Sequence, residues 1–366
     1  MRIAVSSVTY EGIRRNKNEL LMKLSAEGKE IFIVSPKPEK KDGGIGMHFP
    51  VEIEAHGKNP LKDYGLYRQY LTAYKKIKPD IVLNLTIKPN VYSGLACQRL
   101  HIPYIGTING VGDAIFHKGL LSALTLNLLK FGLRRAECVF FQNIKNQELF
   151  VSKGIVQREK AALVPGSGIN ISLHPYEEYP ESGSPVVFTF IGRVSRDKGI
   201  QELVAASRLL KSKGECFEVN VVGSCPDGYQ ELIKKADEDG SIHYLGRVEP
   251  GEIHSILAKS HAVLLPSYHE GIANVLLEGG AAGRPIIASF TEGCEETFDD
   301  GVSGIGFIPQ STDSLVKAME RFLSMSNSER KSMGVKARKK IAAEFNRDMV
   351  DDAYMDAISK VGGKRK

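Results

Sequence analysis

Residues 266–278 of the chain read PSYHEGIANVLLE. Apolar segments at 262–265 and 285–288 flank this stretch and predict two short buried strands. The pattern is therefore strand, loop, helix and strand, which is the repeating unit of a parallel α/β sheet. Gly271 and Ile272 lie where the loop is expected to become the helix. Their backbone N–H groups would then face a ligand in the loop, because the first N–H groups of a helix have no partner within it.

Two glutamates, Glu270 and Glu278, lie in this stretch eight positions apart. A continuous helix would separate them by about 12 Å, which is comparable to the length of an extended sugar nucleotide. One carboxylate could then hold a sugar while the other holds a ribose. The alternative is that Glu270 is only a carboxylate stabilised by the helix dipole and that Glu278 lies on a polar face.

A second group of charges follows the apolar run at 186–191, which predicts a buried strand. Residues 192–199 read GRVSRDKG and include Arg193 and Lys198. When a sugar leaves a nucleotide, the diphosphate that remains gains negative charge, and fixed cations at a strand end can stabilise it. Arg193 would hold phosphate oxygens through its planar fork, and Lys198 would add a point charge. The alternative is a basic turn exposed to solvent.

Together these residues resemble glycosyltransferase family 4, whose members are retaining enzymes of the GT-B architecture. The resemblance is carried by Glu270 and Glu278, by the Pro-Ser pair that opens the stretch, and by AAGRPIIAS at 281–289. It is specific over about residues 186–307 and weaker before them. It implies that Glu270 contacts the donor sugar and that Glu278 contacts the ribose hydroxyls.

The resemblance also implies that Arg193 and Lys198 bind the donor diphosphate. It implies that the backbone at Arg247 and Val248, after a strand at 242–245, contacts the nucleotide base. One departure is the glycine pair at 279–280, where the family usually has better helix formers. A glycine in mid-helix costs roughly 1 kcal/mol relative to alanine, so we expect close backbone packing at this pair.

The first half of the chain alternates apolar strands with helices in the same manner. A loop at 7–16 carries Gly12, and the resembled family uses such a loop to approach the donor phosphates. Basic residues facing an anionic acceptor are the alternative for this loop. After the strand at 104–108, many family members place a histidine close to the reacting sugar. This chain has Asn109 at the comparable point and His117 a little later.

The domain organisation follows from length and from a proline-rich linker. A chain of 366 residues suits two domains. We expect a first domain at 1–180, a second at 184–345, and a terminal helix at 346–361 that packs back on the first. The predicted fold class is α/β, and the resemblance specifies GT-B, with two Rossmann-like domains whose parallel sheets face each other across a cleft.

Composition narrows the cellular setting. The chain shows neither a signal-peptide core nor the ~18 apolar residues of a membrane span, so a cytoplasmic location is expected. The net charge is +8 over residues 1–182 and −2 over the remainder. Nucleic acid is not expected as a partner, because no basic cluster has interleaved aromatic residues. An apolar helix at 118–135 with cationic ends predicts either packing on its own sheet or peripheral contact with an anionic membrane.

The expected function is retaining transfer of a hexose or N-acetylhexosamine from a nucleotide sugar, with UDP as the expected nucleotide. The expected acceptor is a polyprenyl-diphosphate-linked sugar or a nascent surface polysaccharide, at the inner face of the plasma membrane. No cofactor or metal is expected, because the sequence shows no metal-ligand cluster. Two alternatives are a UDP-sugar epimerase of the same architecture and a protein that binds sugar nucleotides without catalysis.

Overall fold

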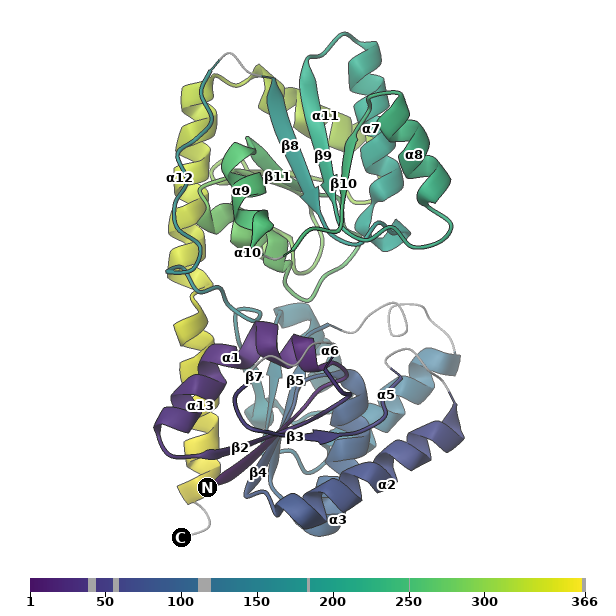
Figure 1. Ribbon diagram of the computed structural model, residues 1–366, viewed down its shortest axis with the longest axis vertical. Coiled ribbons are helices and arrows are strands. Elements are labelled where there is room, and N and C mark those ends of the chain that lie inside the picture. The colour runs from purple at the N-terminus through teal and green to yellow at the C-terminus, as the bar shows by residue number, and fades with distance from the viewer. Residues whose placement is uncertain (39–43, 55–58, 111–119, 183–184, 250, 364–366) are drawn as a thin grey trace. The chain divides into compact units, whose positions relative to one another are not determined.

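A computed structural model of the chain describes residues 1–38, 44–54, 59–110, 120–182, 185–249 and 251–363 (Figure 1). The chain divides into two compact units. The first domain contains Met1–Ser167 together with Asp348–Lys366, and the second domain contains Gly168–Arg347.

The first domain contains a seven-stranded parallel sheet with the strand order β3-β2-β1-β4-β5-β6-β7. Its strands are β1 (Arg2–Ser6), β2 (Glu30–Ser35), β3 (Met47–Pro50), β4 (Ile81–Asn84), β5 (Tyr104–Ile108), β6 (Cys138–Phe141) and β7 (Ala161–Leu163). Its helices are α1 (Tyr10–Ala26), α2 (Pro60–Ile77), α3 (Gly94–Leu100), α5 (Leu120–Leu133), α6 (Ile144–Ser152) and α13 (Arg347–Gly363).

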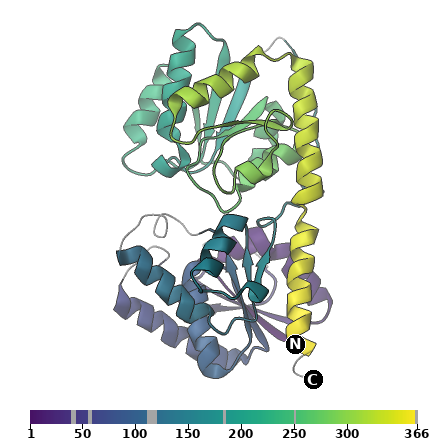
Figure 2. The same cartoon turned by 180° about the vertical axis from the view of Figure 1, so that it is seen from behind.

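Helices cover both faces of this sheet (Figures 1 and 2). Successive strand residues point to opposite sides, so each face contributes to a separate buried cluster. Ile3 and Val5 of β1 pack in one buried cluster with α1 and α13. Ala4 lies in a separate cluster with α2, α3 and α5. A parallel sheet buried on both faces explains why its strands read as apolar runs.

The second domain contains a six-stranded parallel sheet with the strand order β10-β9-β8-β11-β12-β13. Its strands are β8 (Val186–Ile191), β9 (Phe217–Val222), β10 (His243–Gly246), β11 (Ala262–Leu265), β12 (Ile286–Ser289) and β13 (Gly304–Phe307). Its helices are α7 (Ile200–Ser212), α8 (Gln230–Glu238), α9 (Glu252–Lys259), α10 (Asn274–Ala281), α11 (Thr312–Ser324) and α12 (Asn327–Glu344). In this domain α7 packs on α11, and α10 packs on α12.

The segment at 168–182, assigned from the sequence to the first domain and a linker, belongs to the second domain. The Tyr179 hydroxyl donates a hydrogen bond to the His261 carbonyl at 2.8 Å. The buried Arg284 guanidinium donates to the carbonyls of Glu177 and Glu178 at 2.8 and 2.9 Å. These bonds fix the segment on the second domain, although its prolines are typical of a linker.

One local prediction was also wrong. The predicted loop at 7–16 is largely helical, because α1 begins at Tyr10 and the Thr9 hydroxyl caps it by accepting from the Gly12 N–H at 3.1 Å. The glycine-rich region at 36–50 contains the edge strand β3. The Phe49 ring packs on Phe32 of β2, with ring centroids 6.0 Å apart.

Candidate active site

The candidate site lies at the carboxyl edge of the second sheet, where the neighbouring strands β8 and β11 end. The loop after β8 carries Arg193 and Lys198, and the loop after β11 carries Glu270. Parallel strands end at the same edge of a sheet, so the two loops are neighbours. This edge is also where doubly wound sheets bind ligands.

Two glycines allow the loops at this edge to approach each other. Gly199 has φ +69° and lies so close to Pro266 that a β-carbon would overlap the Pro266 carbonyl oxygen. Gly293 has φ +76°, and a β-carbon there would lie 2.6 Å from the Gly271 carbonyl oxygen. Only glycine tolerates both the positive φ and the close backbone. The loops that carry Lys198 and Glu270 are thereby held in a fixed relation.

Lys198 and Glu270 form a direct ion pair between the Lys198 ammonium and Oε1 of Glu270. Their side chains are 21% and 15% exposed, so the pair is largely shielded from water. The hydroxyl of Ser267 donates a second hydrogen bond to the same carboxylate oxygen at 2.6 Å. The structure therefore brings together two residues that lie far apart in the sequence, and it orients the carboxylate from two sides.

Arg193 lies at the same edge, and its side chain is 55% exposed. Its Nη2 lies 3.4 Å from Oδ2 of Asp197. Burial acts to raise the pKa of Asp197, but the Ser195 hydrogen bond and the charges of Arg193 and Lys198 outweigh it, so that pKa is lowered. Asp197 therefore stays ionised and orients the guanidinium, whose planar fork can bind an anionic ligand.

The helix of the central stretch begins later than the sequence suggested. α10 starts at Asn274, so Gly271 and Ile272 lie in the bend before its first turn. The Ile272 side chain is 8% exposed and packs in a cluster with Leu277 and Ile341, which gives it a structural role. Glu278 lies within α10 and is half-buried. The expected separation of about 12 Å between Glu270 and Glu278 applies only to a continuous helix. Because α10 begins after Glu270, that expected separation does not apply.

The expected close packing at the glycine pair is confirmed. A β-carbon on Gly279 would overlap Cγ2 of Val263 in β11. A β-carbon on Gly280 would lie 2.7 Å from Cγ1 of Ile341 in α12. The two glycines let α10 lie close to a strand on one side and to a helix on the other.

Arg247 and Val248 follow β10 at the same edge of the second sheet, with β9 between them and β8. Arg247 is exposed and Val248 is half-buried. Their backbone groups therefore lie on the same side of the sheet as Arg193, although further along its edge.

The first domain holds the remaining predicted residues. Gly12 lies in the first turn of α1, where its N–H is already bonded to Thr9. The Asn109 side chain donates to the Leu85 carbonyl at 2.9 Å and accepts from Gln142 at 3.2 Å. Asn109 therefore joins strand ends at the carboxyl edge of the first sheet. His117 lies outside the described residues.

Sequence reasoning missed two residues that shape the carboxylate loop. Ser267 is fully buried and bonds Glu270 directly. The Tyr268 hydroxyl donates to Glu202 of α7 at 2.7 Å, and burial together with this bond raises the pKa of Tyr268 to about 12. Ser267 could have been suspected as a hydroxyl three positions before a carboxylate, but the contact with Glu202 had no local signal.

Within the described residues, no group of three or more His, Cys, Asp or Glu side chains is arranged to hold a metal ion. The side chains placed at the candidate site include the cations Arg193 and Lys198, the carboxylate of Glu270 and the hydroxyl of Ser267. Such a set suits a ligand with both phosphate and sugar groups.

Comparison with known proteins identifies the family to which the chain belongs. The family described as glycosyl transferase 4-like matches residues 14–143, and the family described as glycosyl transferases group 1 matches residues 177–340. The chain is a family 4-type glycosyltransferase.

Two relatives illustrate the range of proteins that this glycosyltransferase resembles. The N,N'-diacetylbacillosaminyl-diphospho-undecaprenol α-1,3-N-acetylgalactosaminyltransferase of Campylobacter jejuni is 25% identical over 325 residues, which cover 83% of this chain and 85% of that protein. A glycogen synthase of Mycobacterium tuberculosis is 24% identical over 296 residues, which cover 77% of this chain and 69% of that protein.

Solved structures show that the glycosyltransferase has the GT-B fold. Sucrose-phosphate synthase from Thermosynechococcus elongatus superposes with a TM-score of 0.80 at 18% identity, covering 100% of both chains. Anabaena HepE in complex with UDP and glucose gives a TM-score of 0.77 at 16% identity, covering 98% of this chain and 100% of that one. The predicted fold class of two Rossmann-like α/β domains with parallel sheets is thus confirmed.

Helix α5 of the glycosyltransferase divides into an inner and an outer face. Leu129 and Leu133 are buried in the core of the first domain. Leu124 and Phe131 are 56% and 58% exposed, and the exposed Lys130 lies beside them. The inner face therefore packs on its own domain, and the outer face presents apolar and cationic side chains together. Among the described residues, no helix has both the length and the apolar character needed to cross a membrane.

Proposed function

We propose that this glycosyltransferase moves a hexose or N-acetylhexosamine from a UDP sugar to a polyprenyl-diphosphate-linked sugar or a nascent surface polysaccharide. The second domain binds the donor and the first domain binds the acceptor. The observation that carries the donor assignment is the ion pair of Lys198 and Glu270 beside the exposed Arg193 at one sheet edge.

Each residue has a role that its chemistry supports. Glu270 accepts hydrogen bonds from the donor sugar, and Glu278 accepts them from the ribose. Arg193 and Lys198 bind the diphosphate. The ion pair holds one cation and one carboxylate side by side, which suits the point where a sugar joins a phosphate.

Charge development explains why the proposed reaction uses no metal ion. As the bond between the sugar and the diphosphate breaks, negative charge grows on the diphosphate oxygens. Fixed cations stabilise that charge without having to reorganise during the reaction. Transfer with retention of configuration is part of the proposal and rests on the family. Base contacts are assigned to the backbone of Arg247 and Val248. Gly12 is assigned no phosphate contact, because its N–H already caps α1.

The acceptor assignment rests on the first domain and on a relative. The Campylobacter jejuni enzyme carries diphospho-undecaprenol in its name. The first half of this chain has a net charge of +8, which favours an anionic, lipid-linked acceptor at the inner face of the plasma membrane. The outer face of α5 would provide peripheral contact with an anionic leaflet.

The function is tested by measuring UDP release and product formation with a panel of nucleotide sugars, with and without a lipid-linked acceptor. Glu270→Gln, Arg193→Ala and Lys198→Ala should each abolish transfer while leaving the unfolding transition in place. Lys213→Ala is a matched control, because Lys213 forms an exposed ion pair with Glu320 in the same domain. Near-normal turnover in any of the three variants contradicts its assigned role. Conversion of the donor without UDP release would indicate an epimerase instead.

Membrane contact is tested separately by cosedimentation with anionic liposomes at low salt. Replacing Leu124 and Phe131 with serine should reduce binding. Leu61→Ser serves as the control, because Leu61 is 82% exposed on α2. Absence of binding by the wild-type protein would remove the membrane proposal and leave the transferase proposal intact.

A further inference from the structure

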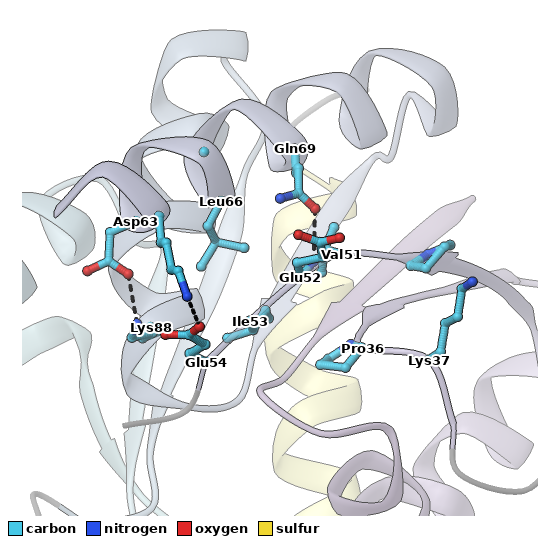
Figure 3. A pocket seen from close by; sticks show the side chains of 13 residues that line it. Pro36, Lys37, Val51, Glu52, Ile53, Glu54, Asp63, Leu66, Gln69 and Lys88 are labelled. Carbon is cyan, nitrogen blue, oxygen red and sulfur yellow. Dashed lines mark hydrogen bonds and ion pairs between the residues drawn. The ribbon is translucent and has the colours of Figure 1, made fainter. Parts of the chain in front are cut away.

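The first domain contains a hollow of about 680 Å³ at the carboxyl edge of its sheet (Figure 3). Its walls come from the residues that follow β2 and β3, from the first half of α2, and from Lys88 after β4. Its volume falls within the range of about 300–1,000 Å³ that is typical of small-molecule sites. The carboxyl edge, where the hollow lies, is also the edge at which parallel sheets of this kind bind their ligands.

Asp63 is the best-fixed polar group in this hollow. Its two oxygens accept hydrogen bonds from the Lys88 ammonium at 2.7 Å and the Tyr92 hydroxyl at 2.9 Å. The Asp63 and Lys88 side chains are only 16% and 14% exposed. Each carboxylate oxygen has a second lone pair, and the ammonium has further N–H groups. A fixed carboxylate beside a fixed ammonium can both accept from and donate to a ligand hydroxyl.

Gln69 adds a second polar group on the same helix. Its Oε1 accepts from the Glu52 N–H at 2.8 Å, and the amide nitrogen then supplies two N–H donors (Figure 3). The buried side chains of Val51 and Leu66 form an apolar floor. Polar groups around a small apolar floor match a ligand that has both hydroxyl groups and a C–H face.

The charge of the hollow identifies the class of ligand. Among the residues that the structure describes, three lysines and three carboxylates line it, so the formal charges of this described lining cancel. A diphosphate would favour an excess of cations, and the described part of the lining has none. An uncharged ligand with many hydroxyls fits the lining better, because its hydroxyls can pair with both kinds of group.

Gly65 leaves one wall of the hollow without a side chain. It lies within α2 and lines the hollow, and a β-carbon built on it would meet no atom within 4 Å. A glycine inside a helix lowers helix stability relative to alanine, and no described atom near Gly65 requires a glycine here. The missing side chain leaves space open to the hollow, which is what a ligand in that space would need.

We propose that this hollow binds an uncharged sugar unit of the acceptor, with Asp63 and Gln69 bonding its hydroxyls and Gly65 leaving room for its ring. The proposal rests on the assignment of the first domain to the acceptor. It adds that the acceptor is recognised through its glycan as well as through its diphosphate. Asp63 and Gln69 are specificity-determining residues in this proposal.

The test uses saturation-transfer NMR on the full chain with methyl glycosides of glucose, galactose, N-acetylglucosamine and N-acetylgalactosamine. The NMR spectra of the wild-type protein should show saturation transfer to at least one glycoside at about 10 mM. This concentration suits the weak binding of a single sugar. Gly65→Phe fills the hollow, and Gln69→Ala removes its amide. Each should raise the dissociation constant of that glycoside by about tenfold or more.

The matched control is Gly362→Phe in α13, a helical glycine of the same domain whose β-carbon would also meet no atom within 4 Å. It should leave glycoside binding unchanged. Glycoside binding by Gly65→Phe that equals that of the wild type would overturn the proposal. Absence of saturation transfer to every glycoside of the panel would also overturn the proposal.

Donor-only UDP release separates this result from the proposed function. It should be the same in wild type and Gly362→Phe, because Gly362 lies outside both the hollow and the donor site. UDP release without glycoside binding would overturn the sugar pocket alone. Absence of UDP release with every nucleotide sugar would instead contradict the transferase proposal.

Discussion

Replacing Ser267 with alanine tests whether the orientation of the Glu270 carboxylate limits catalysis. The Ser267 hydroxyl is fully buried and donates to Oε1 of Glu270 at 2.6 Å, while Lys198 contacts the same oxygen. A hydrogen bond to a charged group contributes about 1.5–3 kcal/mol. Since about 1.4 kcal/mol corresponds to tenfold in rate, we expect kcat/KM to fall by roughly 10- to 100-fold. The Lys198 ion pair remains, so activity should be reduced and not abolished.

The assay is steady-state UDP release with the nucleotide sugar that the wild type uses, combined with urea unfolding. Ser207→Ala is the matched control, because Ser207 is also fully buried in the second domain and its hydroxyl donates a hydrogen bond to the Ser241 carbonyl. Both variants should lose about 1 kcal/mol or more of unfolding free energy. Only Ser267→Ala should lose activity.

Two results would refute this reasoning. The first is a kcat/KM for Ser267→Ala within about twofold of the wild type, which would show that Lys198 alone orients the carboxylate. The second is an equal loss of activity in Ser207→Ala, which would show that activity follows the stability of the domain and not the Ser267 hydrogen bond.

Three further predictions concern stability. Gly279→Ala should lower the unfolding free energy by about 1–3 kcal/mol, because the new methyl group would overlap Val263 in the buried face of β11; an unchanged urea midpoint would contradict this. Gly65→Ala should raise the unfolding free energy by about 0.5–1 kcal/mol, since α2 gains a better helix former and the methyl group meets open space; a lower midpoint would show a hidden clash. His261 is 2% exposed, and burial, with the charges of Arg330 and Arg284, lowers its pKa to about 4. At a pH below the ordinary histidine pKa of 6.5, the unfolded chain therefore binds one proton more than the folded chain. The free energy of unfolding should fall by up to about 1.4 kcal/mol per pH unit as the pH drops from 6.5 towards 4. His261→Asn should flatten urea midpoints over this pH range, and a pH dependence identical to that of the wild type would exclude His261 as a source.

Much of the fold could be predicted from the sequence because its signals are local. A strand buried on both faces of a parallel sheet must be apolar throughout, and the run at Val186–Ile191 shows this directly. Alternation of such runs with helical segments identifies a doubly wound sheet without any knowledge of contacts. The short stretch with Glu270 and the earlier stretch with Lys198 were enough to identify the glycosyltransferase family. The glycine pair at 279–280 also predicted close packing, because two helix-weakening residues need a compensating reason.

Other features depended on contacts between segments that are distant in the sequence. The strand β3 is short and exposed at its ends, and its pairing is supported by the packing of Phe49 against Phe32. The segment at 168–182 has the composition of a linker, and tertiary contacts such as the hydrogen bonds of Tyr179 and Arg284 assign it to the second domain. The open space beside Gly65 is likewise a property of the neighbouring loops, which the sequence of α2 does not contain.

The sequence by itself determined two parallel α/β sheets and the residue types of the proposed sugar-nucleotide site. The tertiary structure decided which of those residues meet. Lys198 and Glu270 are 72 positions apart, and their contact exists because β8 and β11 lie side by side and because Gly199 lets one loop lie against Pro266 of the other. Strand order and backbone approach are properties of the assembled sheet, so no local pattern in either loop could have specified that ion pair.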